Sequence, residues 1–345
     1  MKKIRTAIIG FGMSTQEFHA PAIIKNDNYE LKKILTNNPK NQEVLRKEYP
    51  NVEIIKTFNE AIDDPNIDLI VIATPNEVHD EYTFKALSNN KHVVVEKPFV
   101  EHYKRAKELF DLAKSKNLVL KVFHNRKYDG DINTLNNLIE KQVFGKLVSF
   151  TARFDRIRPD LGDNWRFTNT HMAGIYYDLA PHLVHHALHL FGLPESVENN
   201  IYFDRENSIV DDHFEMILHY KDGFKAFIGA EMLQRDLVPK IKLIGTNKTY
   251  AKYDFDIPDS ANYPYKEKYQ VKKLKSELID NDLKIEEIPV EIGKHYLYYE
   301  NLSQDILNNV SINNEDTLLG LGVVLVMEKG MEAYKENKRV LISKI

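Results

Sequence analysis

The first 123 residues alternate between short apolar runs and segments with helical periodicity. Runs rich in β-branched residues fill five stretches, and a weaker sixth run covers residues 52–55. The five are residues 4–9, 29–35, 67–73, 92–95 and 118–123. Between them, residues 78–88 and 103–116 carry apolar side chains at helical spacing. Because apolar strands separated by helices are typical of a parallel sheet covered on both faces, the pattern predicts a doubly wound α/β domain that binds nucleotides.

The pattern changes after residue 123. Helical periodicity at residues 132–141 leads to a strand-like run at 147–153, and a strongly periodic helix is expected over residues 177–191. Four further strand-like runs follow without helices between them, at residues 197–203, 214–220, 224–231 and 240–244. Asp222-Gly223 separates two of these runs and is a hairpin-turn signal. Successive strands of this kind predict an α+β domain built on an open, mostly antiparallel sheet.

The remaining segments complete the expected organisation. Residues 254–284 are polar and rich in Tyr and Lys, and their pattern favours no element. Helical patterns at residues 296–309 and 318–337 close the chain. We therefore expect a dinucleotide-binding domain over residues 1–123 and a substrate-binding and oligomerisation domain over residues 124–345.

Composition narrows the class of protein. The 345 residues are 43% hydrophobic and 28% charged, which is typical of a soluble globular chain of two domains. Forty-seven Lys and Arg against 51 Asp and Glu give a net charge of −4, so neither nucleic acid nor a membrane surface is an expected partner. The absence of cysteine excludes disulfides, thiolate metal sites and cysteine nucleophiles. Since no apolar run approaches the about 20 residues of a spanning helix, we expect a cytoplasmic protein.

A glycine-rich turn follows the first predicted strand. Gly10 permits a tight turn there, and Gly12 lets the backbone approach a pyrophosphate held at the N-terminus of the next helix. Thr15 replaces the third glycine of this pattern and is expected to loosen the packing of helix on strand slightly. The motif predicts a dinucleotide site that includes Gly10, Gly12, Met13 and Ser14.

The end of the second predicted strand is where a ribose-selecting residue is expected. The residues there are Thr36, Asn37 and Asn38, with Lys40 close behind. Glu30 lies at the opposite end of the strand, so no acid is placed to bind a ribose 2′-hydroxyl, and no arginine is placed to bind a 2′-phosphate. The choice between NAD and NADP stays open.

Two further strand ends carry candidate chemistry. Glu96 and Lys97 end the fifth strand at the carboxyl edge of the sheet, where open α/β sheets bind ligands. An ammonium at this position can polarise a substrate oxygen, whereas the plainer alternative is a surface lysine before a turn proline. Thr74, Pro75 and Asn76 end the fourth strand at the same edge and are expected to line the nicotinamide pocket.

The helix expected at residues 177–191 carries several histidines. Asp178 and His182 are four residues apart and share one face, so the carboxylate could orient the imidazole for proton transfer. A surface pair is the alternative. His185, His186 and His189 follow on the same helix. A zinc site can use such spacing, but no carboxylate cluster accompanies it, so no metal site is predicted.

Taken together, these stretches resemble the Gfo/Idh/MocA family of NAD(P)-dependent oxidoreductases, and most of all its scyllo-inositol dehydrogenase-like branch. The similarity is colinear and spans both expected domains. The matching stretches are GFGMSTQEFHAPAI from Gly10, ATPNEVH from Ala73, VVVEKP from Val93, FHNRKYDGD from Phe123, DNWRF from Asp163 and GIYYDLAPHLVHHALHLFG from Gly174.

The resemblance implies an N-terminal Rossmann domain and assigns roles to particular residues. Lys97, Asp178 and His182 would be the catalytic residues. The cofactor NAD or NADP would contact Gly10, Gly12, Met13, Ser14, Thr36, Asn37, Asn38, Thr74, Pro75, Asn76, His79, Glu96 and Lys97. The substrate would contact Lys97, Asn125, Arg126, Trp165, Arg166, Asp178 and His182. The pair Trp165-Arg166 lies in an irregular segment, as either an active-site lid or a packing anchor.

The implied reaction is hydride transfer between nicotinamide and a secondary alcohol or ketone of a cyclic polyol or sugar. His182 is the expected base, and the competing assignment gives this role to Lys97 with a pKa lowered by burial. The resemblance also implies a homodimer or homotetramer formed through the open sheet face.

The sequence departs from the family pattern, and other classes of function remain to be weighed. Besides Thr15, the chain carries His185 where many relatives have a second aspartate, which bears on the recognition of substrate hydroxyls. A catalytically inactive dinucleotide sensor is the alternative function, although a sensor would not need Lys97, Asp178 and His182 together. A zinc-dependent hydrolase built on the histidine-bearing helix is a third reading.

Overall fold

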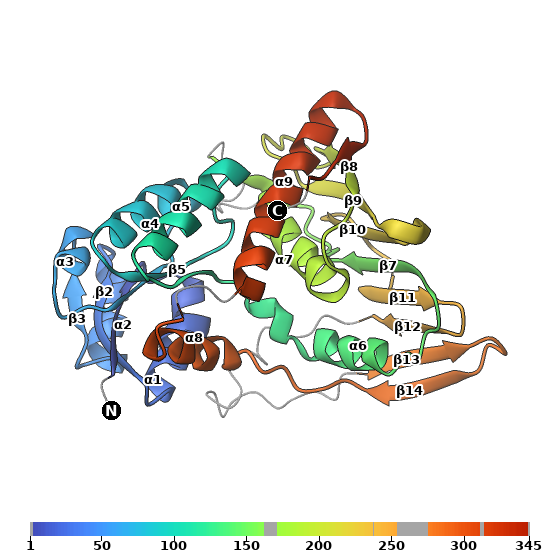
Figure 1. Ribbon diagram of the computed structural model, residues 1–345. Coiled ribbons are helices and arrows are strands. Elements are labelled where there is room, and N and C mark those ends of the chain that lie inside the picture. Colours follow the sequence, from blue (N-terminus) through green and yellow to red (C-terminus); the bar gives the residue numbers. More distant parts are fainter. Residues whose placement is uncertain (1–2, 162–170, 237, 254–274, 311–313, 344–345) are drawn as a thin grey trace.

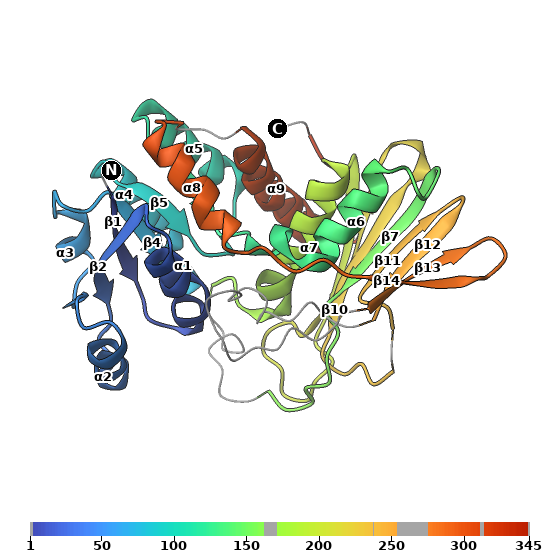
Figure 2. The same ribbon diagram turned by 90° about the horizontal axis from the view of Figure 1, so that it is seen from below.

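The computed structural model describes residues 3–161, 171–236, 238–253, 275–310 and 314–343. Two sheets lie at opposite ends of the molecule, and helices fill the space between them (Figures 1 and 2). Among the described residues, no helix has both the length and the apolar character needed to cross a membrane.

The first sheet has six parallel strands in the order β3-β2-β1-β4-β5-β6. Their bounds are β1 Ile4–Ile9, β2 Tyr29–Leu35, β3 Glu53–Ile55, β4 Leu69–Ile72, β5 His92–Val95 and β6 Leu120–Val122. The order reverses between β1 and β4, and in open α/β sheets the crevice at such a switch point binds the ligand. The prediction of a doubly wound parallel sheet is confirmed.

Helices cover both faces of this sheet. They are α1 (Ala20–Lys25), α2 (Pro39–Glu48), α3 (Asn59–Ile62), α4 (His79–Ser88) and α5 (Tyr103–Ser115), with short helical turns η1 (Thr15–His19), η2 (Asn76–Val78) and η3 (Asn125–Tyr128). Successive residues of β1 enter two different cores: Ile4 and Ile8 face one, while Ala7 and Ile9 face the other. This alternation explains why apolar residues occupy both faces of the strand.

The second sheet has nine strands in the order β14-β13-β12-β11-β7-β10-β9-β8-β15. Their bounds are β7 Leu147–Arg153, β8 Ser196–Tyr202, β9 His213–His219, β10 Lys225–Glu231, β11 Ile241–Gly245, β12 Lys248–Lys252, β13 Lys275–Asp280, β14 Ile285–Pro289 and β15 Val340–Leu341. Only the β7–β10 pair is parallel, so the predicted open, mostly antiparallel sheet is confirmed.

Local signals in this part of the chain succeed unevenly. The predicted hairpin joins β9 to β10 through the helical turn η5 (Lys221–Gly223), where Asp222 and Gly223 have φ angles of 58° and 80°. β13 falls in the stretch without a predicted element and forms another hairpin with β14, which follows that stretch. On β14 both Ile285 and the two Glu residues are exposed, which weakens the apolar signal of a strand.

Three helices lie between the second sheet and the first domain, namely α6 (Gly130–Glu140), α7 (Gly174–Phe191) and α9 (Asn314–Glu336) (Figure 2). Helix α7 contributes Leu179, Leu183 and Ala187 to the core formed with β7, β9 and β10. The helix therefore carries its polar residues toward the first domain with little freedom to shift.

The end of the chain returns to the first domain. Helix α8 (Leu297–Leu307) places Tyr298, Tyr299 and Leu302 in the first-domain core that also contains Ile4 and Ile8. Helix α9 contributes Val324 to the other first-domain core and Val326 to the core of the second sheet. The division at residues 123 and 124 stays a prediction, and both closing helices tie the two parts together.

Candidate active site

The glycine turn after β1 has the geometry that a bound pyrophosphate requires. Gly10 has a φ of 105°, and a Cβ there would lie 2.2 Å from the carbonyl oxygen of Ala73, so only glycine fits. A Cβ at Gly12 would meet nothing within 4 Å, so the fold itself does not require glycine at this position. The open space beside Gly12, at the start of a helix, fits a dinucleotide phosphate.

Thr15 does not simply loosen this turn, as the sequence suggested. Its side chain is fully buried, and its hydroxyl donates a hydrogen bond of 2.9 Å to the carbonyl oxygen of Gly10. The extra hydrogen bond fixes the turn to the helix that follows, in the place where a third glycine would allow closer packing.

The predicted ribose-selecting residues lie beside the glycine turn. The Asn41 amide donates to the carbonyl of Phe11 at 3.2 Å, which joins α2 to the turn. Asn38 caps α2, because its side chain accepts a hydrogen bond from the backbone N–H of Lys40 at 2.9 Å. Thr36 is buried, and the side chain of Asn37 donates to the carbonyl of Lys56. The structure brings all three predicted residues to the carboxyl edge of the sheet.

The loop after β4 is held by buried polar contacts. Asn76 donates to the main-chain carbonyl of Met172 at 2.9 Å, while Pro75 is exposed. His79 is fully buried, and its two ring nitrogens lie 2.7 Å from the carbonyl oxygen of Pro98 and 3.0 Å from that of Thr74. Burial lowers the pKa of His79. This imidazole therefore joins the loops after β4 and β5, and it offers no free face to a ligand.

Lys97 and Asp178 meet across the two domains. The Nζ atom of Lys97, at the end of β5, lies 2.8 Å from Oδ1 of Asp178 and 2.7 Å from its main-chain carbonyl oxygen on α7. Both side chains are largely buried. They line a small cleft with Asn76, Pro98, Met172, Ala173 and Gly174. Three predicted site residues from three separate elements thus share one cleft.

The structure corrects the predicted partnership of Asp178 with His182. The buried Nδ1 of His182 has no hydrogen-bond partner in the part of the chain that the structure describes, and its ring lies edge-on to Phe154. Asp178 instead holds the ammonium of Lys97. Helical spacing puts Asp178 and His182 on one face, but a cation from the other domain is the stronger partner for a carboxylate.

Burial keeps His182 and its neighbours neutral. Desolvation lowers the pKa of His182 well below its usual value, and the charges of Lys97 and Arg126 lower it further. Burial also lowers the pKa of His124 to about 3 and that of His186 to about 4. His185 stacks on His124 with ring centroids 4.5 Å apart. No group of three or more metal-binding side chains is placed to hold a metal among the residues with described positions.

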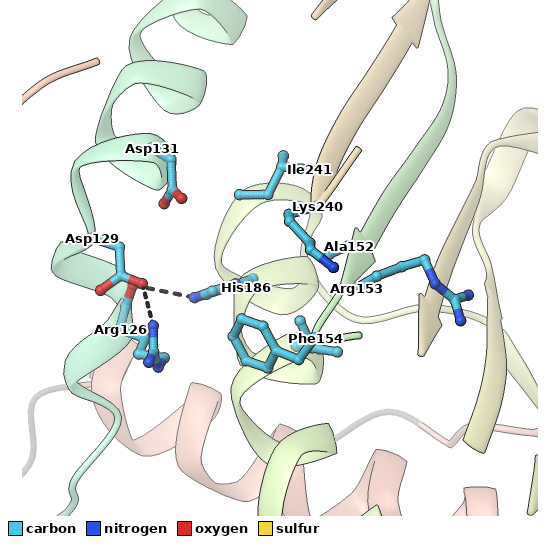
Figure 3. A pocket seen from close by; sticks show the side chains of 10 residues that line it. Arg126, Asp129, Asp131, Ala152, Arg153, Phe154, His186, Lys240 and Ile241 are labelled. Atoms are coloured by element: carbon cyan, nitrogen blue, oxygen red, sulfur yellow. Dashed lines mark hydrogen bonds and ion pairs between the residues drawn. The ribbon is translucent and has the colours of Figure 1, made fainter. Parts of the chain in front are cut away.

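A polar pocket lies beneath this histidine-bearing face of α7 (Figure 3). Arg126 pairs with Asp129 at 2.9 Å and lies 5.1 Å from the ring centroid of Phe154. His186 contacts the main-chain carbonyl of Arg126 at 3.2 Å. The enclosed space has room for about one water molecule. Arg126 is therefore placed near His182 through Phe154, but its guanidinium is already engaged.

Three other predicted substrate residues remain, and the structure describes one of them. Asn125 is buried, and its amide lies 3.3 Å from Nδ1 of His295. Trp165 and Arg166 lie outside the described residues.

Two residues that sequence reasoning missed lie directly behind Lys97. His19 contacts the carboxylate of Glu96 at 3.0 Å and the hydroxyl of Tyr299 at 2.6 Å. Glu96, predicted to contact the cofactor, is thus turned toward the interior. The position of His19 in the helix after the glycine turn was the available signal, whereas Tyr299 is 280 residues away along the chain.

A glycine turn at the switch point of a parallel sheet, faced by an ion pair that joins two domains, defines a two-domain, dinucleotide-dependent oxidoreductase. The chain belongs to the Gfo/Idh/MocA oxidoreductase family. Residues 4–124 match the family model described as an oxidoreductase family NAD-binding Rossmann fold, and residues 132–251 match the GFO/IDH/MocA C-terminal domain. The chain is therefore an enzyme that uses NAD(P).

Similar proteins extend over the whole chain. The uncharacterized oxidoreductase YdgJ of Escherichia coli is 32% identical over 99% of both chains. The scyllo-inositol 2-dehydrogenase (NADP(+)) IolW of Bacillus subtilis is 28% identical over 98% of this chain and 96% of its own. The solved structure of the Bacillus subtilis protein yvaA has a TM-score of 0.90 at 27% identity, covering 99% of both chains.

Proposed function

We propose that this enzyme transfers a hydride between nicotinamide and a secondary alcohol or ketone of a cyclic polyol or sugar. The observation that carries the proposal is the contact of Lys97 with Asp178, 2.8 Å apart at the carboxyl edge that also carries the glycine turn. An ammonium held by a carboxylate at this edge is placed to donate a hydrogen bond to a substrate oxygen.

The chain's own residues divide the remaining work. The bound dinucleotide supplies the hydride acceptor or donor. Lys97 hydrogen-bonds the reacting oxygen and stabilises the negative charge that develops on it. His182 is kept neutral by burial, and the ring nitrogen that carries no proton is the proposed acceptor of the hydroxyl proton during oxidation. Asp178 accepts a hydrogen bond from the Lys97 ammonium and holds it in the cleft.

The substrate class is supported by relatives rather than by a bound molecule. IolW, which matches over nearly its whole length, is named for its action on scyllo-inositol. A levoglucosan dehydrogenase of Pseudarthrobacter phenanthrenivorans is 30% identical over 39% of this chain. Both names denote ring compounds that carry secondary hydroxyls, so a cyclic polyol or sugar is the substrate class that we propose.

A panel assay tests the proposal. Reduction of NAD+ and of NADP+ is followed by absorbance with scyllo-inositol, myo-inositol, glucose and levoglucosan, and oxidation of the reduced cofactors is followed with the matching ketones. We expect turnover with at least one ring compound and its loss in Lys97→Met. Binding of dinucleotide without turnover of any of these compounds would contradict the proposed substrate class and would favour a sensor.

The pH profile of oxidation identifies the base. Since burial and neighbouring cations lower the pKa of His182, we expect kcat/KM to hold down to a pH below about 6.5 and then to fall as the imidazole is protonated. This acid limb should vanish in His182→Asn. If the limb persists in His182→Asn and is lost in Lys97→Met, lysine is the base.

We also propose that the outer face of the second sheet joins copies of the chain. Ile217 and Phe227 are paired across neighbouring strands and point away from the helix-covered core. Phe227 is 37% exposed, which leaves an aromatic ring in water on an open sheet face. Light scattering at micromolar concentration is expected to give the mass of a dimer or tetramer, and a strictly monomeric mass would contradict this.

A further inference from the structure

We propose that His19 and Tyr299 are positioning residues that hold Lys97 in its working position by fixing Glu96. Neither residue belongs to the cleft itself. The inference rests on the proposed catalytic role of Lys97. It adds a requirement that helix α8 be packed against the first domain for full activity.

A continuous hydrogen-bond network joins Tyr299, His19, Glu96 and Lys97. The Tyr299 hydroxyl lies 2.6 Å from Nδ1 of His19, and Nε2 of His19 lies 3.0 Å from Oε1 of Glu96. The second oxygen of Glu96 accepts the backbone N–H of Lys97 at 3.2 Å. If the phenol donates to Nδ1, the Nε2–H of a neutral imidazole donates to the carboxylate, so one tautomer satisfies every contact.

This hydrogen-bond network is buried and therefore rigid. His19 is fully buried and Tyr299 is 1% exposed, so neither can exchange its partner for water. The ring of His19 also packs on Phe123 with centroids 4.1 Å apart, and Tyr29 donates its hydroxyl to the main-chain carbonyl of Tyr299 at 2.8 Å. Breaking one contact would leave a buried polar group unpaired, which is unfavourable.

The positions of His19, Glu96 and Tyr299 indicate what this hydrogen-bond network does. His19 lies in η1, directly after the glycine turn that is expected to hold the pyrophosphate, and Glu96 ends β5 beside Lys97. The hydrogen bond between His19 and Glu96 thus connects the phosphate-binding helix to the backbone of the lysine. Tyr299 adds the C-terminal part of the chain to this link. An error of 1 Å in the position of a catalytic group can cost about 10²-fold in rate.

The ionisation of Glu96 supports the role of His19. Burial raises the pKa of Glu96, but the hydrogen bond from His19 is the largest of the favourable interactions that outweigh burial and lower it. Tyr299 on α8 and His124 after β6 are the other titratable groups coupled to this carboxylate. Without His19, burial would dominate and the pKa of Glu96 would rise.

Matched variants test the inference. His19→Leu removes both contacts, His19→Gln keeps an amide able to donate to Glu96, and Tyr299→Phe removes one hydroxyl. Tyr298→Phe is the control, because Tyr298 is also a buried tyrosine on α8. Its hydroxyl donates to the main-chain carbonyl of Val122, which lies outside the hydrogen-bond network. We expect kcat to fall about 10²-fold in His19→Leu and on the order of tenfold in Tyr299→Phe. We expect recovery of most of the loss in His19→Gln and little change in the control.

Two further readouts distinguish positioning from a general loss of structure. Hydrogen exchange of peptides spanning residues 93–99, measured without cofactor, should be faster in His19→Leu and Tyr299→Phe but not in Tyr298→Phe, since the Lys97 amide loses a fixed acceptor. The kcat of His19→Leu should also gain an acid limb as Glu96 is protonated. The affinity for dinucleotide should stay within about threefold of the unmodified chain.

The outcomes separate this inference from the proposed function. Wild-type kcat, pH profile and exchange in folded His19→Leu, with Lys97→Ala inactive, would overturn the positioning role alone. An active Lys97→Ala would overturn the proposed function. If His19→Leu does not fold, Tyr299→Phe against Tyr298→Phe decides, because equal exchange and equal kcat in those two variants would also overturn the inference.

Discussion

The two sides of the candidate active site differ in how their nitrogen-bearing side chains are partnered. On the side of the parallel sheet, the Nζ of Lys97 contacts two oxygen atoms of Asp178. The backbone N–H of Lys97 donates to Glu96, whose carboxylate also contacts His19. On the side of α7, His182 and His185 each bury an Nδ1 atom without a partner among the described residues. Oxygen partners hold the lysine side chain in place, whereas desolvation favours the neutral form of the two histidines.

This difference suits a reaction that moves a hydride and a proton together. Stabilising a developing alkoxide calls for a fixed positive charge, while accepting its proton calls for a neutral base. Lys97 has a carboxylate partner and the Nδ1 of His182 has none among the described residues, so the two side chains suit different roles. The lysine side supplies charge, and the histidine side supplies a proton acceptor.

Removing the charged side of the comparison should have the largest effect. Lys97→Ala is expected to lower kcat by about 10²–10⁴-fold, because the variant lacks the ammonium that Asp178 holds in the cleft. Dinucleotide affinity, measured by fluorescence titration, should change little. Lys85→Ala is the control, since Lys85 is an exposed lysine of α4 that pairs with Glu81. Comparable rates for the two variants would contradict the role of Lys97.

The same contrast shows what the sequence can predict. The strands β1, β4 and β5 are mostly apolar because both of their faces are largely buried, so their composition indicates them. The Asp222-Gly223 turn was equally readable, because positive φ angles select these residues. The position of Lys97 follows from the end of its strand. These features depend on residues that are near one another in the chain.

The histidine side could not be predicted in this way. Spacing on α7 brought Asp178 and His182 to one face, but the choice of partner for Asp178 depends on a lysine 81 residues earlier. The link from Tyr299 to His19 depends on α8 returning to the first domain. Burial of the imidazoles, which sets their pKa, is a property of the packed helix and the sheet beneath it.

A substitution in the glycine turn tests whether the cofactor lies on the lysine side. Gly12→Val is expected to lower dinucleotide affinity by at least about tenfold, or 1.4 kcal/mol, because the side chain enters the open space left for the pyrophosphate. Its melting temperature should stay close to that of the unmodified chain, since a Cβ at Gly12 meets no atom within 4 Å.

Gly10→Ala is the contrasting variant. Its Cβ would lie 2.2 Å from a carbonyl oxygen, so stability should fall before any effect on binding is measured. Unchanged dinucleotide affinity in folded Gly12→Val would show that the cofactor binds elsewhere.

Acid stability tests the histidine side. Folded-state pKa values of about 3 for His124 and about 4 for His186 lie below the value of about 6.5 in an unfolded chain. Above pH 6.5 both states are neutral and stability is complete. As the pH falls from 6.5 toward 4, the unfolded chain takes up protons that the folded chain refuses, so stability declines.

Each such histidine adds up to about 1.4 kcal/mol per pH unit to this decline. In His186→Gln, urea unfolding between pH 7 and pH 4.5 should therefore show a shallower loss of stability than in the unmodified chain. Equal slopes in the two proteins would indicate that His186 is protonated in the folded state.

The smallest expected effect concerns the choice between NAD and NADP. Thr36, Asn37 and Asn38 present no carboxylate to repel a 2′-phosphate and no guanidinium to bind it, and the side chain of Asn38 is committed to capping α2. The difference in binding free energy should therefore lie within about 1–3 kcal/mol. Titration of the protein with NADH and NADPH measures it directly.

Lys40→Ala sharpens the result: Lys40 is the exposed cation in the first turn of α2, so the variant should weaken NADPH binding and leave NADH binding unchanged. A preference above about 10³-fold for either cofactor would exceed this range and require a selecting residue outside residues 36–40.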